Sequence, residues 1–498
     1  MRARKDTRSE DLLYTLAVRY DRWRREHSRG GEQDKRRTRA LVFGAGEAAG
    51  TLLHGMVFDP DSPFEPVGIL DDDPAKRRER VAGIRVIGTR HDLGKAVGDT
   101  GAEALIFAVA NAEAELVREM RERAVAAGVD LLVVPEASEV LDHELGARDI
   151  RDVQVTDLLG RHRIEVDERA IDDLVRGKRV LITGAGGVIG SELCRQIHRF
   201  EPAELMMFDH DEAALQAVQL SVDPRAELHD PSVLLGDVRD TDRVREIFRT
   251  RNPEVVFHAA ALKHQPLLER HPSEAVKTNV LGTLALLEAA GEAERFVTVS
   301  ADKAADPVSV LGYTQRITER LTAWANRDQP GVFLSVRFGN VLGSRGSVLT
   351  KFRAQIADGG PITVTHPEVR RFLMTTQEAV SLLLQAAAIG GGGEAMVLHL
   401  GEPVLIDQLA RELVRLSGQL VDVVYTGLRP GEKLGEVLFG PGEIDERPYH
   451  RLISHVAVPA LNPSAVRDLA AAGDTEVLVR RLGELCAAVP PLKVRPAA

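Results

Sequence analysis

Residues 179–197 read RVLITGAGGVIGSELCRQI, and this stretch decides the fold of most of the chain. A short apolar run leads directly into Gly184, Gly187 and Gly190, and a helical pattern follows them. Glycines at this spacing let the backbone turn sharply from a strand into a helix, and the free N–H groups at the helix start can bind a pyrophosphate. The stretch therefore predicts the first strand–helix unit of a dinucleotide-binding domain.

A carboxylate in the expected place supports this prediction. The next apolar run, residues 205–208, ends in Asp209. An acidic residue about 20 residues beyond the glycine loop binds the adenosine ribose and disfavours the 2′-phosphate of NADP. We therefore predict NAD as the cofactor, with His210 as a neighbouring contact.

Further apolar runs extend the pattern in both directions. Runs at 233–237, 255–258, 296–300 and 334–338 follow the glycine loop, whereas runs at 40–43, 67–70, 104–109 and 131–135 precede it. Strands that alternate with helical stretches are typical of parallel sheets with helices on both faces. We predict an α/β chain with two Rossmann-like, doubly wound parallel-sheet domains and a smaller C-terminal substrate-binding region. The expected boundaries are 1–38 for an N-terminal helix and linker, 39–165 for an accessory domain, 166–338 for the NAD-binding domain, 339–456 for the substrate-binding region, which is interleaved with that domain, and 457–498 for a tail.

The first domain has a glycine loop of its own, residues 44–50 (GAGEAAG), and Asp71–Asp73 follow its second apolar run. This loop resembles a nucleotide fingerprint, but a purely structural, oligomer-forming role explains it equally well. Residues 11–25 place apolar side chains on one helical face, which indicates a capping or dimer-forming helix. We accordingly expect a homo-oligomer.

Charge and cysteine content exclude several classes of protein. The net charge of −11 over 498 residues argues against nucleic acid as the main partner. Cys194 and Cys486 are the two cysteines, and they form neither a disulfide framework nor a metal site, so a reducing cytoplasm is expected. The best charge-free stretch, residues 379–393, is shorter than the roughly 20 residues of a membrane-spanning helix. We therefore predict a soluble, cytoplasmic protein with no membrane partner.

Six motifs resemble one family, the polysaccharide-biosynthesis family of UDP-N-acetylglucosamine 4,6-dehydratases, which are extended short-chain dehydrogenases/reductases. They are TGAGGVIGSELCRQI, HAAALKHQPLLE, TNVLGT, SADKAADP, RFGNVLGSRGSV and TGLRPGEKL, and the resemblance runs from about residue 38 to residue 453. The first domain is similar to the Rossmann unit of long family members, which usually carry membrane helices before it. Residues 1–37 are charged instead, so the chain resembles a soluble variant.

The resemblance implies a lyase that works by oxidation, elimination and reduction. Hydride leaves C4 of the sugar, the resulting ketone acidifies the C5 proton, water is eliminated across C5–C6, and hydride returns to C6. The resemblance makes Asp302 the acid that protonates the leaving hydroxyl and Lys303 the base at C5. A lysine base requires desolvation or a neighbouring cation, and Lys263 could be that cation.

The chain departs from the general short-chain dehydrogenase pattern, in which a hydroxyl residue precedes Tyr-x-x-x-Lys. Ala301 stands at the hydroxyl position, Leu311 at the tyrosine position and Gln315 at the lysine position. Gln315 can still hydrogen-bond the ribose, but it carries no positive charge. Tyr313 is a candidate for the missing phenol, although two helix positions from Leu311 it points to a different face.

The remaining expected contacts fall into two groups. Those to the cofactor come from the glycine loop, from the ends of the following strands and from two helices: Gly184, Gly187, Val188, Ile189, Gly190, Asp209, His210, Asp237, Val238, Ala259, Ala260, Ala261, Lys263, Asn279, Ser300 and Gln315. Those to the substrate, which by resemblance include diphosphate and uridine contacts, are Lys263, His264, Asn340, Arg345, Arg371, Arg429 and Glu432. Arginine suits this role because its planar fork meets phosphate oxygens in pairs.

Three functions remain open at this point. The first is an NAD-dependent dehydratase acting on UDP-N-acetylglucosamine or a close relative. The second keeps oxidation and elimination but acts on another nucleotide sugar, or on a nucleoside in a secondary pathway such as antibiotic biosynthesis, to give an exocyclic alkene or an epimer. This second function is motivated by the altered triad and by Gln265 and Gly435, which stand where the family usually has Val and Tyr. The third is a non-catalytic nucleotide-binding scaffold, against which the retained Asp302 and Lys303 speak.

Overall fold

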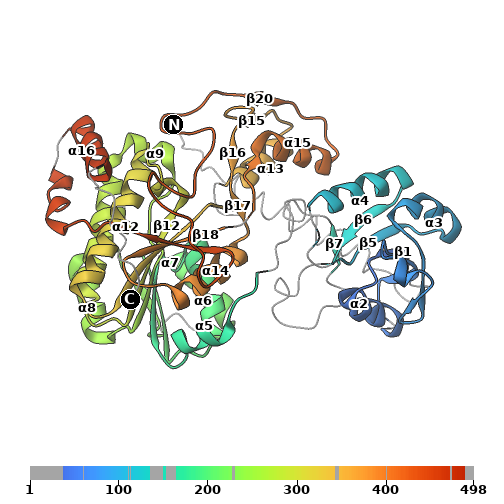
Figure 1. Cartoon of the computed structure of the whole chain (residues 1–498), viewed down its shortest axis with the longest axis horizontal. Coiled ribbons are helices and arrows are strands. Elements are labelled where there is room, and N and C mark those ends of the chain that lie inside the picture. The colour runs from blue at the N-terminus through green and yellow to red at the C-terminus, as the bar shows by residue number, and fades with distance from the viewer. Residues whose placement is uncertain are drawn as a thin grey trace, which may run out of the picture. The chain divides into compact units, whose positions relative to one another are not determined.

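The computed structural model describes residues 37–487 except for 60, 110, 111, 113, 135–149, 153–163, 227–229, 343–346, 400, 472 and 473. The chain divides into two compact units between residues 161 and 162, coloured blue to cyan and green to red in Figure 1. Each unit is described by itself. The predicted helix at residues 11–25 lies outside the described residues.

The first unit is a sheet with the order β3-β4-β2-β1-β5-β6-β7. Its strands are β1 (Thr38–Phe43), β2 (Phe64–Leu70), β3 (Arg80–Val81), β4 (Ile84–Gly88), β5 (Ala104–Phe107), β6 (Asp130–Val133) and β7 (Arg151–Asp152), and its helices are α2 (Glu47–Phe58), α3 (Leu93–Thr100) and α4 (Ala114–Ala127). The inner pairs are parallel, and the edge strands β3 and β7 are antiparallel. β1 and β5 are almost wholly buried because helices cover both faces of a parallel sheet.

The second unit contains a larger sheet with the order β10-β9-β8-β11-β12-β13-β18-β21. Its strands are β8 (Arg179–Thr183), β9 (Glu204–Asp209), β10 (Val233–Leu235), β11 (Val255–His258), β12 (Arg295–Ala301), β13 (Val332–Phe338), β18 (Glu394–Leu398) and β21 (Ile453–Ala457). All neighbours are parallel except β18 and β21, which are antiparallel. The strand order reverses between β8 and β11, so a ligand is expected outside the carboxyl ends of β8, β11 and β12, a region that we call the crevice.

Two helical layers cover this sheet (Figure 1). One apolar cluster joins the sheet to α5 (Glu168–Val175), α6 (Val188–His198), α7 (Glu212–Val222) and α14 (Thr376–Ile389). The other joins it to α8 (Thr241–Arg251), α11 (Thr283–Ala289), α12 (Val310–Asp328) and α16 (Thr475–Ala487). The segment expected to be only a tail therefore contributes α16, whose Leu478 and Leu482 are buried.

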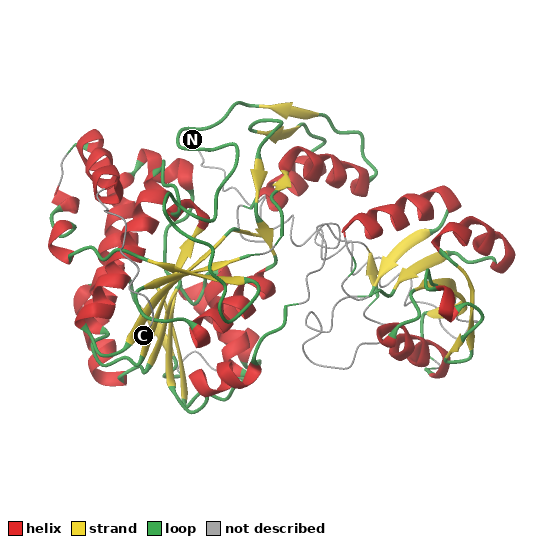
Figure 2. Cartoon of the chain, viewed as in Figure 1, coloured by secondary structure: helices red, strands yellow, loops and turns green. Residues whose placement is uncertain are grey.

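The region beyond β13 adds three small two-stranded sheets, whose short strands are drawn in Figure 2. They pair β14 (Asn340–Val341) with β17 (Leu373–Met374), β15 (Ile362–Val364) with β20 (Val423–Tyr425), and β16 (Arg370–Arg371) with β19 (Val404–Leu405). Helices α13 (Val348–Ala357) and α15 (Ile406–Ser417) pack beside them.

The predicted fold class is confirmed, since both units are α/β with sheets that are mainly parallel. The domain boundaries given above stay a prediction. Among the residues that the structure describes, every helix is too short or too polar to cross a lipid bilayer.

Candidate active site

The glycine loop between β8 and α6 has the tight geometry that its sequence predicts. Gly184 has φ +68°, and a Cβ there would lie 2.7 Å from the backbone nitrogen of Ala260. A Cβ on Gly190 would collide with the carbonyl oxygen of Gly184. No side chain caps α6 at Gly187, so the first N–H groups of the helix stay available for an anion. Val188 and Ile189 form the first turn, and Val188 lines an open cavity of about 320 Å³.

Asp209 ends β9 next to this loop. One of its carboxylate oxygens accepts a hydrogen bond of 2.9 Å from the backbone N–H of Gly186, and the other lies 3.1 Å from His210 Nδ1. The side chain is only 8% exposed. A carboxylate has about four lone-pair sites, so Asp209 can still accept hydrogen bonds from ribose hydroxyls.

The ends of the next strands contribute Asp237 and Val238. Arg239 donates to Asp237 from its side chain and its backbone. Burial alone would raise the pKa of Asp237, but these hydrogen bonds hold it below its ordinary value. Val238 is buried and packs against Gly282, the last residue of a π-helical turn at Val276–Gly282.

Asn279, in this π-helical turn, holds the loop that follows β11. Its Oδ1 accepts from the N–H of Leu262 at 2.8 Å, and its Nδ2 donates to the carbonyl of Leu262 at 3.0 Å and to Thr314 Oγ1 at 3.1 Å. The predicted cofactor contact is thus a buried clamp. Asn279 thereby fixes the loop that contains Ala259–Ala261 and the exposed Lys263 and His264. His264 is the residue before α9 (Gln265–Arg270).

A buried histidine that sequence reasoning missed lies beneath this loop. His258 bridges Thr183 Oγ1 at 2.7 Å and Thr283 Oγ1 at 2.8 Å, so it joins the end of β8 to the end of β11 and to α11. Burial lowers its pKa from 6.5 to about 4. A histidine in an apolar strand carries no periodic signal, which explains why the sequence did not reveal it.

The shifted pKa of His258 makes stability depend on pH. Between 6.5 and about 4 the unfolded chain binds a proton at this residue that the folded chain does not. Stability therefore falls as the pH drops through this window and is fully present above it. We expect His258 to remove about 2 kcal/mol from the free energy of unfolding between pH 7 and pH 5.

Urea unfolding of wild type and of the His258→Gln variant at both pH values measures this effect. The loss on acidification should be about 2 kcal/mol smaller in the variant. The exposed His198→Gln variant serves as a control and should behave like wild type. An unchanged pH dependence in the His258→Gln variant would contradict the assignment.

The turn after β12, residues 302–306, brings the predicted acid and base together, and we call it the Asp–Lys turn. Asp302 is fully buried, and its Oδ1 accepts a hydrogen bond of 2.9 Å from Lys303 Nζ. Lys303 Nζ also donates to Asn340 Oδ1 at 3.3 Å. The second oxygen of Asp302 is buried and has no hydrogen-bond partner within the described part of the chain. Such an unsatisfied oxygen is costly to a fold, and a bound water or ligand can supply its missing partner.

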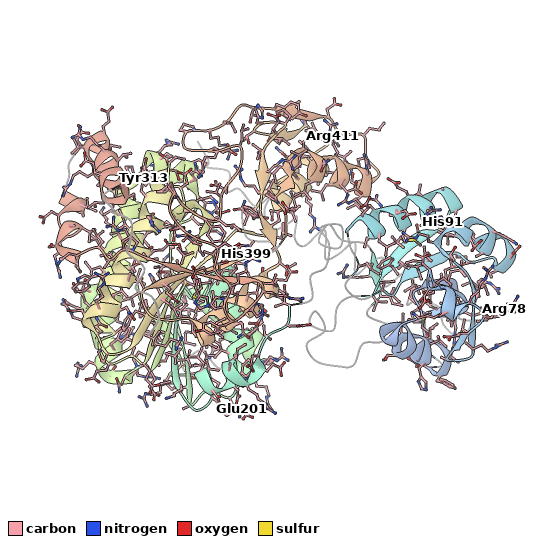
Figure 3. The ribbon with its side chains drawn as sticks, in the orientation of Figure 1. Arg78, His91, Glu201, Tyr313, His399 and Arg411 are labelled. Atoms are coloured by element: carbon pink, nitrogen blue, oxygen red, sulfur yellow. The ribbon has the colours of Figure 1, made fainter. Side chains whose placement is uncertain are left out.

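The face of α12 toward the crevice lacks the usual hydroxyl and cation. Leu311 is buried in the apolar cluster, and the buried Oε1 of Gln315 has no hydrogen-bond partner among the described residues. Tyr313 lies against α16, with its hydroxyl near Gly483, and Figure 3 labels its position in the second unit. Burial raises its pKa. Tyr313 is therefore not among the residues gathered around the Asp–Lys turn, and its position does not suit the phenol role expected for it.

Ser300, another predicted cofactor contact, belongs to a buried charged network. Its hydroxyl donates to Glu319 at 2.8 Å, and Glu319 accepts two hydrogen bonds from Arg337. Arg337 also pairs with Glu443, 2.7 Å away, and Arg316 contacts both glutamates. Burial alone would lower the pKa of Arg337, but the two carboxylates hold it above its ordinary value. Sequence reasoning did not identify these four charged residues.

The predicted substrate contacts partly come together. Arg371 pairs with Glu432 at 3.1 Å, and the other oxygen of Glu432 accepts from the backbone N–H of Arg429. Lys351, which the sequence analysis did not single out, lies in the same cluster, and burial followed by the charge of Arg429 lowers its pKa. Arg345 lies outside the described residues.

Comparisons with known proteins agree with this geometry. Residues 180–457 match the model of the polysaccharide biosynthesis protein family, and residues 12–135 match that of a CoA-binding domain. The probable polysaccharide biosynthesis protein EpsC of Bacillus subtilis is 40% identical over 414 residues, which are 82% of this chain and 69% of that protein. The UDP-glucose 4-epimerase of Rickettsia rickettsii is 33% identical over 55% of this chain and 82% of the epimerase. The solved structure of Pen from Bacillus thuringiensis is 32% identical, with a TM-score of 0.51, and covers 57% of this chain and 89% of that chain.

These matches confirm the resemblance that the six motifs carry. The family model includes the glycine loop, the Asp–Lys turn and the Arg371–Glu432 pair in one continuous range. The chain belongs to the polysaccharide biosynthesis protein family.

Proposed function

We propose that this chain is an NAD-dependent dehydratase that acts on a nucleotide sugar such as UDP-N-acetylglucosamine. Family membership and the similarity to a UDP-glucose 4-epimerase support an enzyme that modifies a nucleotide sugar. The observation that carries the finer proposal is the Asp–Lys turn, where a buried carboxyl oxygen that has no partner in the described part of the chain lies beside an amine. This turn follows β12, at the same edge of the sheet as the glycine loop after β8.

The residues of the crevice fit a dinucleotide. A Cβ would fill the cradle at Gly184 and Gly190, Asp209 can accept ribose hydroxyls, and the uncapped start of α6 suits the pyrophosphate. Gln315 would donate to the nicotinamide ribose. Bound NAD would supply the acceptor and donor of hydride, which no side chain can supply.

The Asp–Lys turn would carry out the elimination. The proton shared by Lys303 Nζ and Asp302 Oδ1 can pass to the carboxylate, which yields a neutral amine and a carboxylic acid without any net change of charge. The amine then takes the C5 proton, the carboxyl group protonates the C6 hydroxyl, and water leaves across C5–C6.

The experiment that tests this proposal incubates purified protein with UDP-N-acetylglucosamine in D₂O. Mass spectrometry should detect a product that has lost one water and carries solvent deuterium. Retained NAD without any turnover of nucleotide sugars or nucleosides would overturn the proposal and favour a non-catalytic scaffold.

A second candidate keeps this chemistry but changes the substrate to another nucleotide sugar or to a nucleoside. Leu311 and Gln315 favour it because they stand where a phenol and an ammonium group are expected, and both are buried on α12. Lys351 beside Arg429 adds a cation to the region that would bind the nucleotide. No turnover of UDP-N-acetylglucosamine, together with loss of water from another member of a substrate panel, would select this candidate.

A further inference from the structure

Residues 433–443, which we call the strap, lead away from the predicted nucleotide contacts and touch the Asp–Lys turn. At the start of the strap, Lys433 Nζ donates to the main-chain oxygen of Asp306 at 2.6 Å. It also lies 3.4 Å from the Asp306 carboxylate and 3.1 Å from Glu436 Oε2. A lysine amine therefore holds the last residue of the turn from its outer side.

The other end of the strap packs on the same turn. A Cβ on Gly440 would collide with the carbonyl oxygen of Ala305, so the two backbones are in close contact. Glu443 fixes this arrangement, because it accepts from the N–H of Gly440 at 2.8 Å and pairs with the buried Arg337. Arg337 also donates to the carbonyl of Leu438 at 2.9 Å.

The residue before the strap belongs to the predicted nucleotide site. Glu432 accepts hydrogen bonds from Arg371 at 3.1 Å and from Thr365 Oγ1 at 2.9 Å. The side chains at 432 and 433 thus face two different partners: the nucleotide cluster and the Asp–Lys turn. A shift of Glu432 when a diphosphate engages Arg371 would move the Lys433 backbone as well, because a single peptide bond joins the two residues.

We infer that the strap couples nucleotide binding to the placement of Asp302 and Lys303, with Lys433 as the positioning residue. The inference rests on the proposed function. Lys433 holds the backbone of the turn and not the reacting atoms, so it acts through Asp306. Binding of the nucleotide part of the substrate orders the turn and so places the acid and the base. Binding energy from a remote part of the substrate thereby lowers the barrier at the reacting carbon.

Amide hydrogen exchange of the peptide 300–306, followed by mass spectrometry with and without UDP, tests this coupling. In wild type, saturating UDP should slow exchange in this peptide about tenfold, the usual size of coupling between two sites. In the Lys433→Met variant UDP should still bind, as calorimetry will show, but the protection should disappear. The Lys433→Arg variant keeps a donor for the Asp306 carbonyl and should restore part of it.

Arg411→Met provides the matched control. Arg411 is an exposed cation on α15 that is paired with Asp407 and is labelled in Figure 3. This variant should show the full wild-type protection. If Lys433→Met lowers the melting temperature, Lys433→Ala, which also lacks the donor to the Asp306 carbonyl, replaces it, and exchange is measured at a temperature at which both proteins are folded.

The outcomes distinguish this inference from the proposed function. If UDP binds the Lys433→Met variant and still protects the turn as in wild type, the coupling is overturned but the dehydratase proposal is not affected. The same holds if UDP binds wild type without protecting the turn. Failure of UDP to bind wild type overturns the proposed nucleotide site, and the coupling with it. In active protein, Lys433→Met should lower kcat for the full substrate and leave KM nearly unchanged.

Discussion

Replacement of Lys303 by alanine is expected to lower the rate of water loss from UDP-N-acetylglucosamine by about 10³-fold, the usual contribution of a positioned acid–base group. The variant removes the amine that lies 2.9 Å from Asp302 and 3.3 Å from Asn340. Without it no other amine in the described turn can take the C5 proton, and Asp302 also loses the donor that shares its proton. Mass spectrometry of the product measures the rate of water loss, and mass spectrometry of the NAD released from the protein measures how much cofactor the variant holds.

NAD content decides whether this loss is chemical. Lys303 follows β12 and does not belong to the glycine loop, so the variant should retain as much NAD as wild type. Lys277→Ala is the control and should keep full activity, because it removes an exposed lysine of the π-helical turn that is paired with Glu274 on the preceding helix. An active Lys303→Ala enzyme would remove the assigned base from the proposed mechanism.

Replacement of Arg337 by methionine is expected to lower the free energy of unfolding by about 3–5 kcal/mol, the cost of breaking a buried ion pair. Arg337 is fully buried, and so is Glu319, whose carboxylate would lose two of its donors. Glu443 would keep Arg316 alone among its charged partners. Methionine has a similar length, so the loss would come from charge and hydrogen bonding and not from a cavity.

Urea unfolding of both proteins measures the difference. Arg176, which is half exposed and paired with Asp172, provides the control, and its replacement by methionine should change the free energy of unfolding by less than about 1 kcal/mol. A similarly small effect at Arg337 would show that the buried network contributes little net stability. The Arg337→Met variant should also perturb the strap, because Leu438 and Glu443 both contact this arginine.

The parts of the site that sequence reasoning predicted are the parts with local signals. Gly184 and Gly190 appear in a loop of fixed spacing, and Asp209 follows one strand later, so each can be identified from its near neighbours. The same holds for the parallel sheets, since an apolar run of a few residues marks each buried strand. Asp302 and Lys303 were reached through a motif, and the structure adds the buried oxygen that distinguishes them from a surface ion pair.

The parts that were missed depend on contacts between distant residues. Glu319 and Glu443 are 124 positions apart in the chain, yet both bind Arg337. The sequence around either glutamate contains no pattern that predicts this shared partner. Asn279 stays a predicted cofactor contact, but the sequence could not reveal that both ends of its amide bind Leu262. Tyr313 is a candidate in the sequence because it stands two positions from Leu311, and its packing against α16 could not be foreseen because that segment was expected to be only a tail.

The pairing of β21 with β18 has a consequence for how the chain is made. β18 is joined to β13 on one side, and residues 453–457 of a 498-residue chain close its other side. Until the ribosome has delivered those residues, the backbone groups along the outer margin of β18 have no strand to bind, and such margins recruit copies of the same polypeptide. This margin therefore stays open until residues 453–457 have been synthesised, and a chain that stops short of them would be prone to aggregation.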